Sequence, residues 1–229
     1  MVRPRPRQDA ADRRGRSQRG WAGAPHVTMA GVGDLRVWDP IGPDELPEVL
    51  AGMSGRWWLA GGWALDRHLG RQSREHEDTD VLILRHQQGA LQDALGGWDL
   101  HAADPPGRLR PWGTGEVLPV EVHDIWCRRT TTAPWSLQVM IDDAPDGTWR
   151  YRREPRITLP VDDLDGPAST DAMRVLAPEV QLLQKSKGLR PKDQSDFAAV
   201  VPTLEPERRA WLAEALRVAS PGHPWLDAL

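Results

Sequence analysis

The chain has 229 residues, of which 39% are hydrophobic and 27% charged, and its formal net charge is −4. This length suits one compact core with polar extensions. No run of about eighteen apolar residues occurs, which argues against a membrane-spanning helix and a secretory signal, so the sequence predicts a cytoplasmic protein without membrane partners. The single cysteine, Cys127, excludes an intramolecular disulfide and the paired thiols of a zinc knuckle.

Residues 1–35 form an arginine-rich tail in this interpretation. Residues 1–28 carry seven arginines against two aspartates, which leaves 22 basic and 31 acidic residues in the rest of the chain. The tail has too few apolar residues to offset the entropy of ordering, so we expect it to be disordered. Met29 leaves open a second interpretation, in which translation begins there. The acidic body repels nucleic acid, which could bind only through the tail, and attracts cationic small substrates.

The first part of the body alternates short helices and strands. Residues 43–53 place apolar side chains at helical spacing after an acidic first turn. Residues 57–60 are a brief apolar run typical of a strand, Gly61 and Gly62 end it, and residues 63–69 resume helical spacing. This order predicts a strand, a tight turn and a helix.

The next part of the chain predicts further strands. Residues 79–84 are rich in strand-forming side chains, and residues 90–95 predict a short helix closed by a glycine pair. The side chains of residues 117–126 alternate with a period of two, as in a β-strand. Residues 137–141 and 149–151 predict a hairpin that turns at the Pro-Asp-Gly sequence between them.

From Pro178 onward the pattern is helical, with a break over residues 188–191 and further helices to about residue 218. The sequence therefore predicts an α+β fold. We expect a mixed β-sheet flanked by helices over residues 36–165, followed by a small helical part over residues 166–229.

Asp78 and Asp80 lie two residues apart at the entrance to an apolar strand, so both carboxylates project from one face. Magnesium prefers a few carboxylate oxygens together with substrate phosphates, and this pair suits it. A solvated strand end remains the alternative. Gly61 and Gly62, at the start of a helix, predict a phosphate-binding turn, with a plain tight turn as the alternative.

These residues together resemble the aminoglycoside and lincosamide nucleotidyltransferases of the polymerase-beta-like superfamily. The matching strings are Gly-Gly-Trp-Ala-Leu-Asp from Gly61, Leu-Gly-Arg from Leu69, and Arg-Glu-His-Glu-Asp-Thr-Asp from Arg74. The resemblance is specific over residues 57–84 and looser to about residue 204. It implies a nucleotidyltransferase-type sheet and transfer of a nucleoside monophosphate, from ATP or another nucleoside triphosphate, to a hydroxyl of a small acceptor. It also implies two Mg²⁺ ions and an acceptor that resembles these antibiotics.

The resemblance assigns roles to particular residues. Asp78 and Asp80 match the metal ligands of the family, and Gly61, Gly62 and Arg74 match its nucleotide-binding segment.

The family also uses a third carboxylate on a neighbouring strand as a metal ligand or general base. Strand alternation places Glu121 and His123 on one face and Asp124 on the other. The His-Asp-x-Trp string from His123 resembles that of relatives in this family and favours Asp124, with Glu121 as the competing candidate. A purely structural hydrogen bond at the sheet edge is the alternative for either residue.

The lysines give a separate indication, because the chain has only three, Lys185, Lys187 and Lys192. A flexible ammonium suits the end of a triphosphate, and Lys185 is the preferred candidate. Lys187 and Lys192 are also consistent with solvated cations. Asp193 and Asp196 begin the next helix, and we expect them to cap it.

Two other functions fit part of the pattern. A glycosyltransferase also uses an Asp-x-Asp motif, but only one strand and one helix lie between the opening segment and Asp78, whereas that class needs a longer nucleotide-binding region. A non-catalytic or regulatory protein of the same fold, such as one of a toxin–antitoxin pair, would lose a metal carboxylate, and both aspartates are intact. Most of the twelve tryptophans are expected in the core, and Trp112 or Trp135 could stack on a base or sugar.

Overall fold

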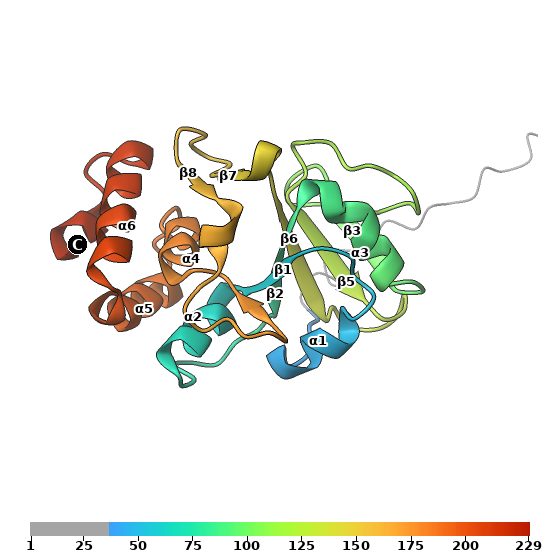
Figure 1. The fold of residues 1–229 in the computed structure, drawn as a ribbon. Helices are drawn as coiled ribbons and strands as arrows, with labels where there is room; N and C mark the ends of the chain where they lie inside the picture. The colour runs from blue at the N-terminus through green and yellow to red at the C-terminus, as the bar shows by residue number, and fades with distance from the viewer. Residues whose placement is uncertain (1–36) are drawn as a thin grey trace, which may run out of the picture.

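The computed structural model describes residues 37–229, so the predicted tail over residues 1–35 lies outside the described part. A seven-stranded sheet in the order β4-β3-β5-β6-β2-β1-β9 forms the centre of the molecule, and β7 and β8 form a separate two-stranded sheet. Figure 1 shows α4, α5 and α6 gathered on one side of the large sheet and α1 and α3 on the other.

The strands of the large sheet are β1 (Trp57–Ala60), β2 (Asp80–Leu84), β3 (Asp99–Ala103), β4 (Leu109–Pro111), β5 (Asp124–Arg128), β6 (Leu137–Asp142) and β9 (Arg174–Val175). The small sheet consists of β7 (Thr148–Arg150) and β8 (Thr158–Pro160). The α-helices are α1 (Leu46–Val49), α2 (Gly61–Leu69), α3 (Gln88–Ala94), α4 (Pro178–Lys185), α5 (Pro191–Val200) and α6 (Pro206–Ala219). Strand β2 runs parallel to β6 and antiparallel to β1, so the predicted mixed sheet and the α+β class are confirmed.

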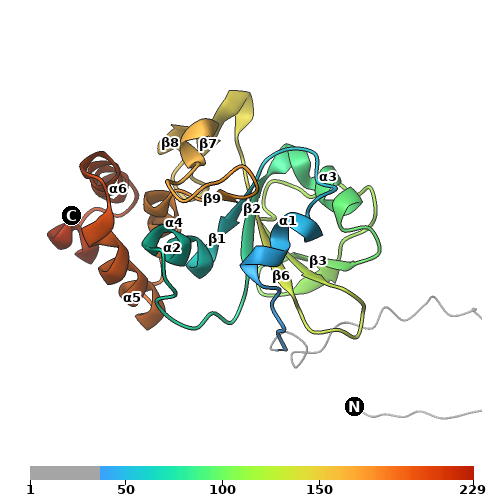
Figure 2. The same ribbon diagram turned by 60° about the horizontal axis from the view of Figure 1, so that its bottom comes forward.

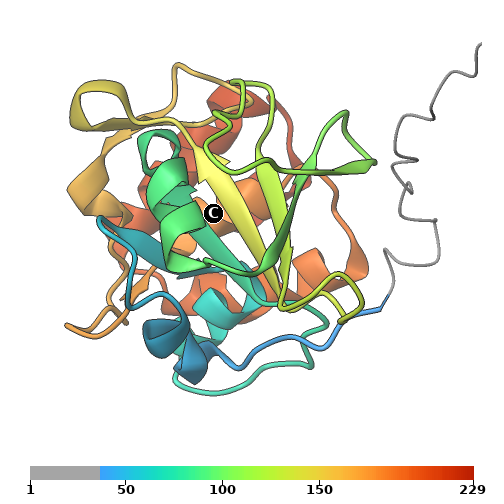
Figure 3. The same cartoon turned by 90° about the vertical axis from the view of Figure 1, so that its right-hand side faces the viewer.

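The apolar run of β2 is buried on both faces of the sheet. Leu82 and Leu84 belong to the core cluster shared with the C-terminal helices, and Val81 and Ile83 belong to the cluster on the α1 and α3 side. Viewed from the α3 side in Figure 3, the C-terminal helices lie behind the sheet. Because side chains alternate along a strand, Asp80 projects from the same face as Leu82, toward the C-terminal helices.

The expected hairpin over residues 137–151 is wrong. Strand β7 pairs with β8, and only an isolated bridge between Asp143 and Arg150 joins the segment back to the end of β6. Burial explains the difference, because Trp149 is fully buried beside α4 and its indole N–H donates a 2.8 Å hydrogen bond to Asp142 Oδ2. Tertiary packing therefore overrides the local turn signal.

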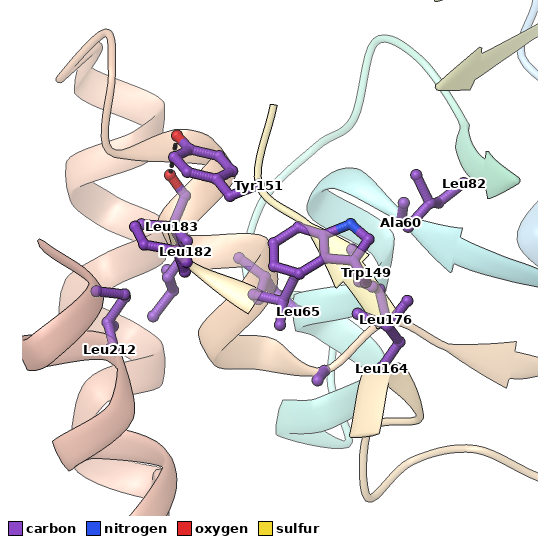
Figure 4. Packing of buried hydrophobic residues seen from close by; sticks show 14 of the residues in the cluster. Ala60, Leu65, Leu82, Trp149, Tyr151, Leu164, Leu176, Leu182, Leu183 and Leu212 are labelled. Atoms are coloured by element: carbon purple, nitrogen blue, oxygen red, sulfur yellow. Dashed lines mark hydrogen bonds between the residues drawn. The ribbon is translucent and has the colours of Figure 1, made fainter. Parts of the chain in front are cut away.

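Tyr151 fixes this small sheet to α4. Its hydroxyl donates a 3.2 Å hydrogen bond to the Leu183 carbonyl oxygen, drawn as a dashed line in Figure 4. We expect Tyr151→Phe to lower the free energy of unfolding by about 1 kcal/mol, because one hydrogen bond is lost while the Leu183 carbonyl keeps the Ser186 hydroxyl, at 2.8 Å, as a partner and the packing is kept. A urea melt would measure this as a lower midpoint with an unchanged slope, and an unchanged midpoint would contradict it.

The three C-terminal helices are confirmed. The boundary predicted at residue 165 stays a prediction, although β9, which follows it, pairs with β1 in the large sheet. Figure 2 shows β9 beside β1. Among the residues that the structure describes, no helix is long and apolar enough to cross a membrane.

Candidate active site

The turn between β1 and α2 brings the chain close to Asp80. Gly61 has a φ of +68°, and a Cβ atom there would lie 2.0 Å from Asp80 Oδ2. A side chain at this position would therefore collide with the carboxylate. The Gly61 N–H donates a 2.7 Å hydrogen bond to Gln181 Oε1 on α4, so this amide already has a protein partner.

The second glycine gives room to the segment that precedes the aspartates. A Cβ atom on Gly62 would lie 2.3 Å from the His76 ring and 2.6 Å from Arg74 Nη2. His76 Nε2 is hydrogen-bonded to Asp66 Oδ2 on α2 at 2.5 Å, and Asp66 also accepts the Ser73 N–H at 3.0 Å. The two glycines thus let a polar loop pack directly against the start of α2.

We expect Gly61→Ala to reduce both activity and stability, because the new methyl group would displace the Asp80 carboxylate. Gly70→Ala is a matched control, since Gly70 has a similar φ of +66° and a Cβ atom added there would meet nothing within 4 Å. Both variants carry about 1 kcal/mol of backbone strain. Thermal melts and activity assays should show an additional loss only in Gly61→Ala, and equal effects would contradict the close approach.

Four carboxylates line one cavity of about 410 Å³, namely Asp193 of α5 and the three candidates Asp78, Asp80 and Asp124. Asp80 opens β2 opposite Gln138 of β6, and Asp124 opens β5 opposite Met140 of the same strand. The residues on β2, β6 and β5 therefore face the cavity from one side of the sheet, and Asp78 lies just before β2. Gln138 Nε2 donates a 3.2 Å hydrogen bond to Asp124 Oδ1.

Glu121, the competing third carboxylate, lies in an exposed turn before β5 and does not line this cavity. The strand begins only at Asp124, so the alternation assumed for residues 117–126 does not apply before that residue.

The carboxylates repel one another, and this repulsion raises the free energy of their ionised forms. Burial and the neighbouring Asp78 raise the pKa of Asp80 to about 7, and Asp124 adds to the shift. A divalent cation would relieve this repulsion, so the donor set fits Mg²⁺. Among residues 37–229, no three or more His, Cys, Asp or Glu side chains are grouped so that they could hold a metal ion, which leaves the Asp78 and Asp80 pair as the candidate protein ligands. Substrate phosphates and water complete magnesium sites of this kind.

Positive side chains line the same cavity. They come from the loop before β2, the β7–β8 connection, α4, the segment that joins α4 to α5, and the first turn of α5: Arg74, Arg152, Arg153, Lys185, Lys187, Arg190 and Lys192. The sequence predicted Arg74 and Lys185 as nucleotide-binding residues, and the structure brings both to the cavity with Gly61 and Gly62. This combination of carboxylates and cations suits a metal-bound polyphosphate.

Asp193 and Asp196 do not cap α5, and that expectation is wrong. Both are buried, with exposed fractions of 0% and 2%. Asp196 accepts two hydrogen bonds from Arg74, at 2.8 and 3.1 Å, and lies 2.9 Å from Lys185 Nζ. Asp193 pairs with Arg190 at 2.7 Å. The two aspartates therefore hold cations of the cavity in place.

Several lining residues were missed from the sequence. Arg152 and Arg153 come from the turn after β7, and Arg152 Nη1 lies 3.7 Å from Asp124 Oδ2. No sequence pattern predicts that these arginines lie near the aspartates, because they are far apart in the chain and are brought together only by the fold. Trp112 and Trp135, considered for stacking, are both buried in the core and do not line the cavity.

Comparison with known proteins agrees with the resemblance found in the sequence. The family model for aminoglycoside-2''-adenylyltransferase matches residues 45–200. A 2''-aminoglycoside nucleotidyltransferase of Escherichia coli is 42% identical over 43 residues, and one of Klebsiella pneumoniae matches equally. Those residues are 18% of this chain and 24% of each relative, so the alignment spans about a quarter of the curated relatives.

Two solved structures are similar to this chain at low sequence identity. The crystal structure of ANT(2")-Ia in complex with adenylyl-2"-tobramycin is 16% identical, has a TM-score of 0.50, and the match covers 76% of this chain and 95% of that chain. The lincomycin-bound lincosamide adenylyltransferase LnuA is 18% identical with a TM-score of 0.49, over 71% of this chain and 98% of that chain. With the family model matching more than half of its length, the chain belongs to the aminoglycoside-2''-adenylyltransferase family.

Proposed function

We propose that this protein transfers AMP from ATP to a hydroxyl group of a small aminated acceptor of the aminoglycoside or lincosamide kind, and releases pyrophosphate. One observation carries the proposal: Asp78, Asp80 and Asp124 line the same cavity as seven Lys and Arg side chains. The family membership and the antibiotic-bound relatives support the choice of acceptor.

The carboxylates take the metal role in this proposal. Asp78 and Asp80 would bind Mg²⁺, with Asp124 as the third carboxylate. When bound, the metal supplies electrostatic stabilisation of the negative charge that develops on the departing pyrophosphate. The raised pKa of Asp80, at about 7, supports the assignment, because a group in such surroundings gains most from a nearby cation.

The cationic side chains would bind the triphosphate. Lys185 is 9% exposed and lies on α4, whose Gln181 holds the Gly61 amide. Arg74 presents its guanidinium beside Gly62. Because Asp196 holds both cations, they are positioned before the nucleotide arrives, which lowers the cost of binding.

The acceptor hydroxyl then attacks the α-phosphorus of ATP. The new bond joins the acceptor oxygen to that phosphorus, the bond to the bridging oxygen of the β-phosphate breaks, and pyrophosphate leaves with the electron pair. Asp124 takes the hydroxyl proton as general base. Gln138 and Arg152 lie beside its two carboxylate oxygens and would hold the carboxylate in orientation.

Mass spectrometry of acceptors incubated with the protein, ATP and Mg²⁺ tests the proposal. We expect an AMP adduct on tobramycin, kanamycin or lincomycin, with one pyrophosphate for each adduct. No adduct on any member of such a panel would contradict the proposed acceptor class.

Replacement of the third carboxylate tests its role. Asp124→Asn should lower kcat at least about 100-fold because the general base is lost. Glu121→Gln is the matched control, since Glu121 is exposed in the turn before β5. A similar kcat for Asp124→Asn and the wild type would remove the base assignment, and a large loss in Glu121→Gln would transfer it.

A further inference from the structure

A second cavity, of about 540 Å³, adjoins the first on the other side of Asp78. It is lined by Trp38, His76, Glu77, Asp78, Trp126 and Gln138, among others. Asp78 and Gln138 also line the first cavity. A molecule in the second cavity would therefore lie next to the carboxylates that the proposed function assigns to the reacting phosphate.

The two cavities differ in charge. Seven Lys and Arg side chains line the first, whereas none lines the second, where Glu77 and Asp78 are the charged groups besides His76. Glu77 is 89% exposed at its side chain and lies 3.7 Å from Lys192, a lining residue of the first cavity. The first cavity therefore suits an anionic group, and the second cavity suits a cationic group.

Two indole rings form one wall of the second cavity. Trp38 and Trp126 meet edge to face with ring centroids 4.8 Å apart, and Trp126 packs in the same manner on Trp135 at 5.6 Å. Trp135 is fully buried, while Trp38 and Trp126 are partly exposed. The wall is therefore anchored in the core and offers aromatic surface to the cavity.

Backbone pairing fixes the outer tryptophan. The Asp39 N–H donates to the Trp135 carbonyl oxygen at 2.9 Å, and the Trp135 N–H donates to the Val37 carbonyl oxygen at 2.9 Å. The segment that carries Trp38 thus runs as a short added strand beside residue 135. A rigid aromatic wall of this kind binds a ligand at low entropic cost.

We infer that Trp38 and Trp126 form the acceptor subsite, which binds a hydroxylated ring that carries ammonium groups. The ring stacks on the indoles, its ammonium groups face Glu77 and the indole rings, and one hydroxyl is directed toward Asp78 and Gln138. This inference rests on the proposed function for the identity of the reaction, and adds the place where the acceptor binds.

Indole N–H signals in a ¹H–¹⁵N NMR spectrum test the subsite directly. The signals of Trp38 and Trp126 are assigned by loss in Trp38→Phe and Trp126→Phe, and tobramycin is then added as the probe, with uncharged maltose as its control. We expect saturable shifts of both signals with tobramycin and smaller shifts with maltose. If tobramycin leaves both signals in place, or maltose shifts them equally, the inference is overturned.

Kinetics provide the second readout. Trp38→Ala and Trp126→Leu should raise KM for tobramycin at least about five-fold through lost stacking, with KM for ATP unchanged. Glu77→Gln should raise it about two- to five-fold, an effect reduced by salt. Trp98→Ala, a partly exposed tryptophan outside the cavity, is the matched control.

The outcomes separate the two proposals. If the wild type binds ATP with Mg²⁺ and adenylylates tobramycin, but the variants keep the wild-type KM for tobramycin, the subsite is wrong and the function stands. If tobramycin shifts both indole signals but no member of the acceptor panel forms an adduct with ATP, the function fails and the binding site stands.

Discussion

Asp80→Asn is expected to abolish activity and at the same time to stabilise the protein in the absence of metal. Loss of the proposed metal ligand should lower kcat by about 10³-fold or more, since a catalytic metal typically contributes several kcal/mol of transition-state stabilisation. The same change removes a carboxylate whose pKa is raised to about 7 by burial and by Asp78. The uncharged amide of asparagine avoids the free-energy cost of a charged carboxylate that is buried beside Asp78.

The stabilisation should depend on pH in a defined direction. The folded state holds a proton on Asp80 up to about pH 7, whereas the unfolded chain releases it near the ordinary carboxyl value. The wild type therefore loses stability as pH rises from about 4 to about 7. The advantage of Asp80→Asn should grow over this range and reach several degrees of Tm at about pH 8 in EDTA.

Two comparisons check this interpretation. Mg²⁺ should raise the Tm of the wild type and leave that of Asp80→Asn unchanged, since only the former keeps the complete carboxylate set. Asp171→Asn, at an exposed loop position, is the control for charge alone. A lower Tm for Asp80→Asn than for the wild type at pH 8 would show that attraction between the Asp80 carboxylate and Lys185 and Lys192 outweighs burial and the repulsion by Asp78, contrary to the account.

Asp196→Asn is expected to cause the largest loss of stability among polar substitutions near the site. Asp196 is 2% exposed, binds Arg74 through two hydrogen bonds and lies 2.9 Å from Lys185 Nζ. Removal of its charge leaves a buried lysine and an arginine without their main counter-ion, at a cost of about 3 kcal/mol. Tm should fall by about 6 to 12 °C.

The same substitution should weaken nucleotide binding more than acceptor binding. Arg74 and Lys185 line the first cavity, and their positions depend on Asp196, so we expect KM for ATP to rise about ten-fold. Glu214→Gln is the matched control, because Glu214 pairs with Arg217 on the surface of α6 with both side chains mostly exposed. That change should cost less than about 1 kcal/mol. Equal losses in the two variants would contradict the positioning role.

The sequence predicts this fold well where local patterns and burial agree. Residues 79–84 are an apolar β-rich run, and they form a central strand buried on both faces. The glycine turn and the Asp-x-Asp motif, adjacent in the sequence pattern, also lie together in the structure, where Gly61, Asp78 and Asp80 line one cavity. The roles of these residues stay predictions.

The features that were missed depend on long-range contacts. Asp193 and Asp196 carry the pattern of helix-capping residues, and only the packing of α5 on α4 shows that they are buried beside Lys185. The hairpin over residues 137–151 failed for a similar reason, since Trp149 is drawn into the core beneath α4. Sequence spacing carries no information on either contact.

The central claim is that the carboxylates and the cationic side chains of the first cavity together bind a metal–triphosphate complex. Calorimetric titration of ATP into the protein, with and without Mg²⁺, tests this claim most directly. We predict saturable binding that requires Mg²⁺ and disappears in the Asp78→Asn, Asp80→Asn double variant. Equal affinity in EDTA, or binding that persists in the double variant, would contradict it.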